Sequence, residues 1–132
     1  MTADDYNGAY SLWNACGLAL GDADSRAGIT RLLLANPGLS FVIETNDEII
    51  GTAVGSFDGR RGWVRHVAVS PRHQGRGIGA ALLTRLEEAF KARGIAQINL
   101  HVTADNAAVT AFYGRLGWTR RHDLILMTKR LT

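Results

Sequence analysis

The segment from Val67 to Leu83 constrains the fold most, because it places three alternating glycines between a β-branched strand and an amphipathic helix. The glycines are Gly75, Gly77 and Gly79. Glycines at alternate positions remove side chains, so several main-chain N–H groups can converge at the start of the helix. Together with the positive end of the helix dipole, these groups form a site for an anion such as a phosphate or pyrophosphate.

Two common phosphate-binding motifs do not fit this loop. A Walker A loop needs a Lys-Ser/Thr pair after the glycines, and none is present. The string Gly75-x-Gly77-x-x-Ala80 matches the dinucleotide-binding fingerprint, but residues 70–74 separate it from the strand that it should follow directly. The next strand also offers His101 where an acidic residue should stand. A third pattern, Gln/Arg-x-x-Gly-x-Gly/Ala, is the one that fits.

Apolar periodicity gives the element order α-α-β-β-β-α-β-α-β-β. Helical spacing predicts helices over residues 4–20, 25–35, 78–93 and 106–116. β-Branched runs predict strands over residues 40–45, 48–57, 63–69 and 95–102, and two more between 118 and 131. An antiparallel meander followed by a β-α-β unit predicts an α/β (α+β) fold whose mixed, mostly antiparallel sheet carries helices on both faces. With no repeat or linker, residues 1–132 are expected to form a single domain.

Composition excludes several classes of protein. A chain that is 46% hydrophobic and 20% charged is not disordered. Cys16 is the only cysteine and the four histidines lack ligand spacing, so we expect no disulfide framework and no metal site. No apolar run approaches the ~18 residues of a membrane span, and residues 1–5 are acidic rather than signal-like. The expected location is therefore the cytoplasm, away from the membrane.

Charge is distributed unevenly along the chain. Residues 1–59 hold eight acidic and two basic side chains, a net charge of −6, whereas residues 60–132 hold thirteen basic and four acidic ones, a net charge of +9. The basic half is expected to attract an anion. A nucleic-acid surface would need exposed aromatic side chains among the basic ones, and here the aromatic residues fall on apolar faces. No nucleic-acid partner is expected.

Three sequence blocks in this order resemble the GNAT superfamily of acetyl-CoA-dependent N-acetyltransferases, and in particular its small stand-alone bacterial members. The blocks are Val67-x-Val69-x-Pro71, then Gln74-Gly75-Arg76-Gly77-Ile78-Gly79 with its helix, and Asn106 followed by Phe112-Tyr113-x-x-x-Gly117-Trp118. The resemblance runs from about residue 5 to the end. Family members usually begin with a strand, whereas this chain starts at or inside the first helix, so either its start is truncated or the strand is lost. The expected GNAT fold therefore has no N-terminal strand. The sheet edge left open makes a homodimer one expectation.

The resemblance implies a site for acetyl-CoA. Main-chain amides of Val67 and Val69 would pair with its pantetheine arm, which enters between two strands that splay apart. The pyrophosphate would be cradled by the residues of the loop: Gln74, Gly75, Arg76, Gly77, Ile78, Gly79 and Ala80. Asn106 would cap the last helix and touch the cofactor, and Phe112 would pack against the arm.

The resemblance also implies the chemistry of acetyl transfer. Tyr113 would act as the general acid that protonates the departing thiolate of coenzyme A. A main-chain N–H near Val67 would stabilise the oxyanion. His101, where some relatives carry a glutamate, is the candidate base for the proton of the amine, and His66, Glu44 and a water chain remain alternatives.

The implied activity is direct acetyl transfer to a primary amine of a protein, a peptide or a small metabolite. Cys16 has no paired base, which argues against an acyl-enzyme. Asp22 and Asp24 lie between the first two helices, where the acceptor is expected, and would favour a cationic amine. The alternative function is a catalytically silent acyl-CoA-binding regulatory module.

Overall fold

The computed structural model describes residues 1–132, which form two compact units, Met1–His101 and Val102–Thr132. The first unit contains, in order, η1 (Ala3–Asp5), α1 (Tyr6–Ala15), η2 (Asp22–Asp24), α2 (Arg26–Ala35), β1 (Ser40–Thr45), β2 (Glu48–Phe57), β3 (Gly62–Val69), η3 (Pro71–His73), α3 (Ile78–Ala92) and β4 (Ile98–Leu100). The second unit contains α4 (Ala107–Arg115). No helix is both long and apolar enough to span a lipid bilayer.

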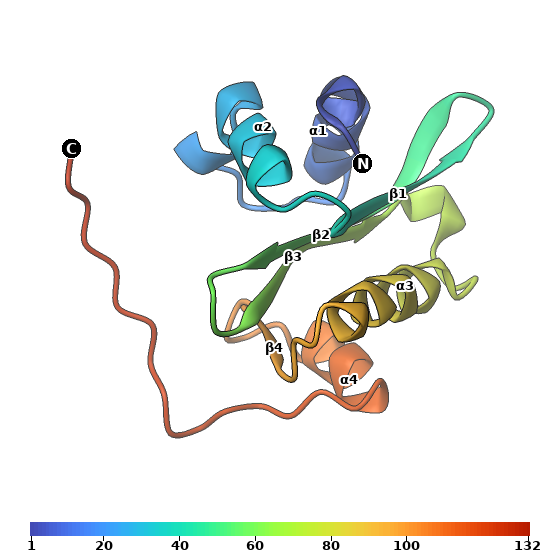
Figure 1. The fold of residues 1–132 in the computed structure, drawn as a ribbon. Coiled ribbons are helices and arrows are strands. Elements are labelled where there is room, and N and C mark those ends of the chain that lie inside the picture. Colours follow the sequence, from blue (N-terminus) through green and yellow to red (C-terminus); the bar gives the residue numbers. More distant parts are fainter. The chain divides into compact units, whose positions relative to one another are not determined.

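The four strands form one open sheet in the order β1-β2-β3-β4. The first three pair antiparallel, and β4 joins β3 in parallel. Figure 1 shows α1 and α2 over one face of this sheet and α3 over the other. The mixed, mostly antiparallel sheet with helices on both faces is therefore confirmed, and no strand precedes α1.

Both faces of the sheet are closed by apolar packing. On the α1 side, Trp13 is completely buried, and its Nε1 donates to Thr52 Oγ1 at 2.9 Å. On the other side, the buried stripe of α3 packs on β2, where glycine permits close approach. A Cβ at Gly55 would lie 2.4 Å from the Leu39 carbonyl oxygen and 2.8 Å from Leu86 Cδ1, so no other residue fits there without displacement.

Two predicted elements, the first helix and the fourth strand, are shorter than expected. α1 ends at Ala15 rather than near residue 20. Gly17 has a φ of +70°, and the Leu18 N–H bonds to the Trp13 carbonyl, which is a Schellman helix stop. A similar motif ends α3, where Gly94 has a φ of +74° and the Ile95 N–H donates to the Phe90 carbonyl. The strand that follows, β4, covers residues 98–100 instead of 95–102.

The prediction of two final strands between residues 118 and 131 is wrong. After α4 the chain contains no strand. The β-branched and apolar pattern is present, but a strand exists only where its N–H and C=O groups find a ladder partner, which a sequence pattern does not supply. Five large apolar side chains are consequently exposed: Leu124, Ile125, Leu126, Met127 and Leu131.

Candidate active site

β3 and β4 lie side by side over only three residue pairs. Residues 62–64 pair in parallel with residues 98–100. Beyond them β4 ends and β3 continues, so residues 65–69 have a strand partner only on the β2 side. An unpaired strand edge offers main-chain hydrogen-bonding groups to an extended ligand. Val67 and Val69, the two residues expected to pair with such a ligand, both lie in this stretch.

A β-bulge at His66 changes the course of β3 at the start of the unpaired stretch. The register with β2 shifts between Thr52 and Val54, and His66 has a φ of +51°, which is unusual for a residue other than glycine. Three contacts hold His66 in this conformation. Thr52 Oγ1 donates to the His66 carbonyl at 2.6 Å, and His66 Nε2 lies 2.7 Å from Asp24 Oδ1. The ring centroids of Trp13 and His66 are 4.3 Å apart. A strained residue persists where its surroundings fix it in this way.

His66 is neutral in this environment. Burial lowers the pKa of its imidazole, although Asp24 acts in the opposite direction. Nδ1 is buried without a hydrogen-bond partner, so the proton belongs on Nε2, which donates to the carboxylate. Because Nδ1 is closed to solvent, His66 is poorly placed to accept a proton from a substrate.

The lowered pKa of His66 predicts that stability decreases in mild acid. An unfolded histidine takes up a proton near pH 6.5, before the folded one does, so stability is complete above pH 6.5 and falls as the pH drops below it. The contribution of one proton is at most about 1.4 kcal/mol per pH unit. Urea unfolding at pH 7.5 and pH 5 should show a larger loss for the wild type than for His66→Gln. Equal losses would contradict the prediction.

The glycine loop leads to a helix terminus that no side chain caps. Gly77 is the N-cap of α3, and the first helical bond runs from the Ala81 N–H to the Gly77 carbonyl at 3.0 Å. The N–H groups of residues 78–80 precede that bond and remain available. Gly75 and Gly77 have φ values of +77° and +78°, and a Cβ at either would meet no atom within 4 Å. The loop is therefore open on this side and suited to an anion.

Polar contacts brace the loop against β3. The Gln74 side chain donates to the Val69 carbonyl at 3.1 Å, and the Cys16 thiol donates to the same oxygen at 3.2 Å. Arg72, by contrast, is held 3.3 Å from Glu48, on the β1–β2 hairpin. Arg76 is exposed and makes no ion pair, so its charge is the one available beside the helix terminus.

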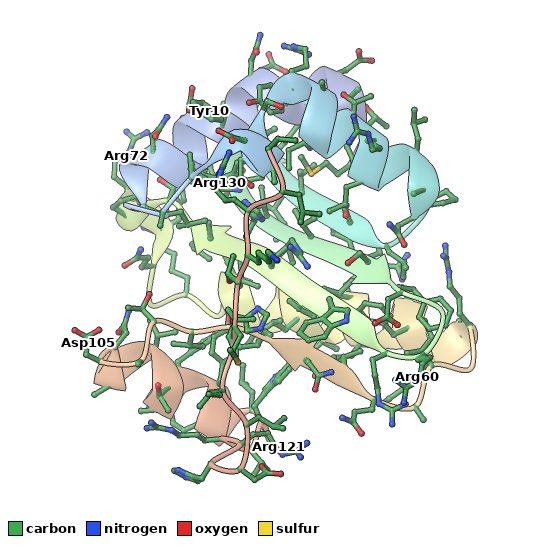
Figure 2. The ribbon with its side chains drawn as sticks, turned by 90° about the vertical axis from the view of Figure 1, so that its left-hand side faces the viewer. Tyr10, Arg60, Arg72, Asp105, Arg121 and Arg130 are labelled. Atoms are coloured by element: carbon green, nitrogen blue, oxygen red, sulfur yellow. The ribbon has the colours of Figure 1, made fainter.

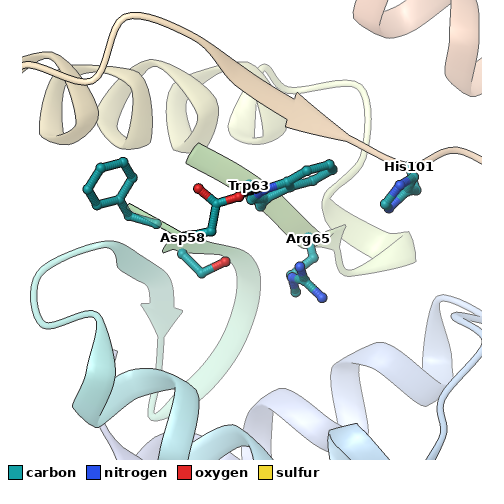
Figure 3. Close-up of a pocket in the computed structure, with 6 residues that line it drawn as sticks. Asp58, Trp63, Arg65 and His101 are labelled. Atoms are coloured by element: carbon teal, nitrogen blue, oxygen red, sulfur yellow. Dashed lines mark hydrogen bonds between the residues drawn. The ribbon is translucent and has the colours of Figure 1, made fainter. Parts of the chain in front are cut away.

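A cavity of about 340 Å³ lies at the β2–β3 hairpin and extends to the point where β3 and β4 separate, and we call it the mouth site. It is lined by Ser56, Phe57, Asp58, Trp63, Arg65 and His101 (Figure 3). The rings of Trp63 and His101 stack with centroids 5.2 Å apart. The sequence predicted His101 as a site residue, and the structure places it here, exposed, at the end of β4. Glu44, another candidate base, lies instead in an acidic groove between α1 and the β1–β2 hairpin, none of whose lining residues belongs to β3 or β4.

The residues of the third sequence block lie in the C-terminal unit. Asn106 caps α4, since its Oδ1 accepts from the Val109 N–H at 3.2 Å. The Tyr113 ring is edge-on to Phe112 at 5.2 Å and to Trp118 at 5.7 Å. Burial raises the pKa of Tyr113 to about 12. Its phenol therefore keeps its proton at neutral pH and can act as a donor.

Sequence reasoning missed two contacts of this site. His66 pairs with Asp24, which is 42 positions away in the sequence, and no local sequence pattern predicts this contact. The stacking of Trp63 on His101 could have been found, because a parallel register that pairs Trp63 with Asn99 puts residue 101 on the same face. Nowhere do three or more His, Cys, Asp or Glu side chains gather in the way that a metal ion requires.

Comparison with known proteins identifies the family. The model of the acetyltransferase (GNAT) family matches residues 4–118. The chain belongs to this family. An acetyltransferase of Sodalis glossinidius is 38% identical over 128 residues, which are 97% of this chain and 90% of that protein. The family assignment, drawn from the three sequence blocks, is confirmed, and with it the class of enzyme, an acyltransferase.

Solved GNAT structures share the fold. The ribosomal-protein-S18-alanine N-acetyltransferase of Escherichia coli superposes with a TM-score of 0.74 at 26% identity, over 89% of this chain and 73% of that one. An N-acetyltransferase of Thermoplasma acidophilum in complex with coenzyme A gives a TM-score of 0.77 at 15% identity, over 88% and 84% of the two chains. At this identity the second likeness concerns the fold alone.

Proposed function

We propose that this GNAT protein is an acetyl-CoA-dependent N-acetyltransferase that moves an acetyl group directly to a primary amine of a protein, peptide or small metabolite. The observation that carries the proposal is the separation of β3 from β4 beside an uncapped, glycine-led helix terminus. The separated strands leave main-chain groups of β3 free to pair with an extended thioester arm. The helix terminus supplies N–H groups that can bind a pyrophosphate. The coenzyme A in the Thermoplasma acidophilum structure of the same fold is consistent with both.

In this proposal the donor lies along β3 and ends at α3. Val67 and Val69 offer main-chain groups to the pantetheine arm. Residues 74–80 surround the pyrophosphate, with main-chain N–H groups of the first helical turn and the free Arg76 guanidinium as donors. That Asn106 and Phe112 also contact the donor remains a prediction from the sequence.

The transfer forms a bond between the amine nitrogen and the acetyl carbon and breaks the bond from that carbon to sulfur. A main-chain N–H near Val67, just after the bulge, stabilises the oxyanion of the tetrahedral intermediate. Tyr113 gives its proton to the departing thiolate, which its raised pKa leaves it able to do. His101 takes the proton of the amine; it is exposed in the mouth site, whereas His66 Nδ1 is buried.

The proposal is tested by following release of free thiol from acetyl-CoA with purified protein and pooled primary amines. We expect release that requires both protein and amine, with the acetylated product identified by mass spectrometry. Binding of acetyl-CoA in calorimetry without turnover on any amine would instead support the silent acyl-CoA-binding module. Absence of binding would overturn both.

A further inference from the structure

We propose that the mouth site selects acceptors that carry a carboxylate in addition to the primary amine, and that Arg65 is the residue that determines this specificity. The inference rests on the proposed acetyl transfer and names the acceptor class of the same site.

The mouth site extends to the point where β3 and β4 part, beside the stretch of β3 along which the thioester arm is proposed to lie. Val64 and Leu100 are the last paired residues of β3 and β4, so Arg65 and His101 are the first residue on each strand after the strands part. Both line the mouth site (Figure 3). A thioester lying beside residues 65–69 would therefore be next to any amine held in this cavity.

The floor of the mouth site is held rigidly. Trp63 Nε1 donates to Asp58 Oδ2 at 3.1 Å, and the indole stacks on His101 at an interplanar angle of 25°. Phe57, 41% exposed, adds an apolar wall. A flat or apolar part of an acceptor can pack on these rings without ordering new side chains.

The mouth site has one acidic and one basic side chain, and the basic one is the charged group whose hydrogen-bonding atoms are free. Asp58 is the acidic residue of the lining, and its carboxylate is already used: Oδ1 accepts from the main-chain N–H groups of Arg60 and Arg61 at 2.8 Å each, and Oδ2 from Trp63. These hydrogen bonds hold the pKa of Asp58 at about 2. Arg65 is exposed and makes no ion pair. Its guanidinium can bind a carboxylate through two parallel hydrogen bonds.

The cationic acceptor expected from Asp22 and Asp24 is not favoured by this geometry. The Asp24 carboxylate pairs with His66 and accepts from the Gly21 N–H at 2.8 Å, so it is not open to a ligand. The acidic groove lined by Glu44 would suit a cation, but it includes no residue of β4 and reaches the unpaired part of β3 only through Ser70, just after that strand ends.

The test compares ω-amino acids with their carboxamides, in which the distant amine is nearly unchanged and the carboxylate is the main difference, and it uses spermidine as the cationic probe. For wild-type protein we expect kcat/KM to be at least about tenfold higher for the acids than for the amides. Arg65→Glu should bring that ratio to one or below and raise the relative rate with spermidine. Arg31→Glu, the same charge change on the exposed face of α2, should leave the ratio unchanged.

Three results would overturn the inference. Wild-type protein that acetylates acids and amides equally has no carboxylate selection. An Arg65→Glu variant that loses rate equally with all acceptors has lost something other than specificity. Acetylation confined to spermidine would assign the acceptor to the acidic groove. If wild-type protein acetylates no amine at all, the proposed function itself fails, and the inference fails with it. Calorimetry with acetyl-CoA on the wild type and each variant shows whether a loss of acetylation comes from a loss of donor binding.

Discussion

Gly77→Glu is expected to abolish binding of acetyl-CoA, raising its Kd by roughly 100-fold or more. The added carboxylate would lie at the N-terminus of α3, where the pyrophosphate is proposed to bind, and like charges brought together cost several kcal/mol. The open space around this residue means that the new side chain displaces no protein atom. Isothermal titration calorimetry with acetyl-CoA measures the change directly.

Two controls separate the charge from its side effects. Gly77→Ala introduces the same strain, because φ is +78° and any L side chain is disfavoured there, but it adds no charge. Gly94→Glu introduces the same residue at a φ of +74°, again with no atom within 4 Å, at the opposite end of α3. We expect a modest loss of affinity for the first and none for the second. A Gly77→Glu protein that is folded by circular dichroism and binds acetyl-CoA normally would show that the loop is not the pyrophosphate site.

The sequence predicts the parts of this fold that local chemistry decides. Ser25 caps α2 by accepting from the Gly28 N–H, and the Asn46-Asp47 turn joins β1 to β2 with positive φ at both residues. These features follow from side chains within a few positions of one another. The glycine loop is of the same kind, so the candidate anion site could be proposed from the sequence alone.

The remaining features depend on which strands meet, and a single sequence does not reveal that. The β-branched pattern after residue 118 predicts strands equally well whether or not a partner edge exists. The acceptor side shows the same difficulty. Asp24 was expected to be free for a cationic substrate, but the fold pairs it with His66. The exposed Arg65 of the mouth site, which the sequence did not single out, has free hydrogen-bonding groups instead. Figure 2 shows Arg60 and Arg72 at opposite ends of the sheet, so a net positive charge on residues 60–132 does not mark one surface.

Tyr113→Phe is expected to lower kcat by about 100-fold or more while changing the Kd of acetyl-CoA by less than about threefold, since general acid catalysis contributes about 10²–10⁴-fold. Phenylalanine keeps the ring and therefore its edge-on contacts with Phe112 and Trp118. What is lost is one hydroxyl, which makes no hydrogen bond within the C-terminal unit and so is not required to hold that unit together. Binding and turnover should separate for this reason.

The control for this substitution is Tyr10→Phe, which removes a hydroxyl from an exposed tyrosine on α1. We expect unchanged kcat. The pH profile adds a second criterion: with a pKa of about 12, Tyr113 stays protonated from pH 6 to pH 9, so any inflection of kcat in that range belongs to another group and should persist in Tyr113→Phe. If the variant instead turns over at the wild-type rate, the leaving thiolate takes its proton from water, and residues 112–113 serve packing alone.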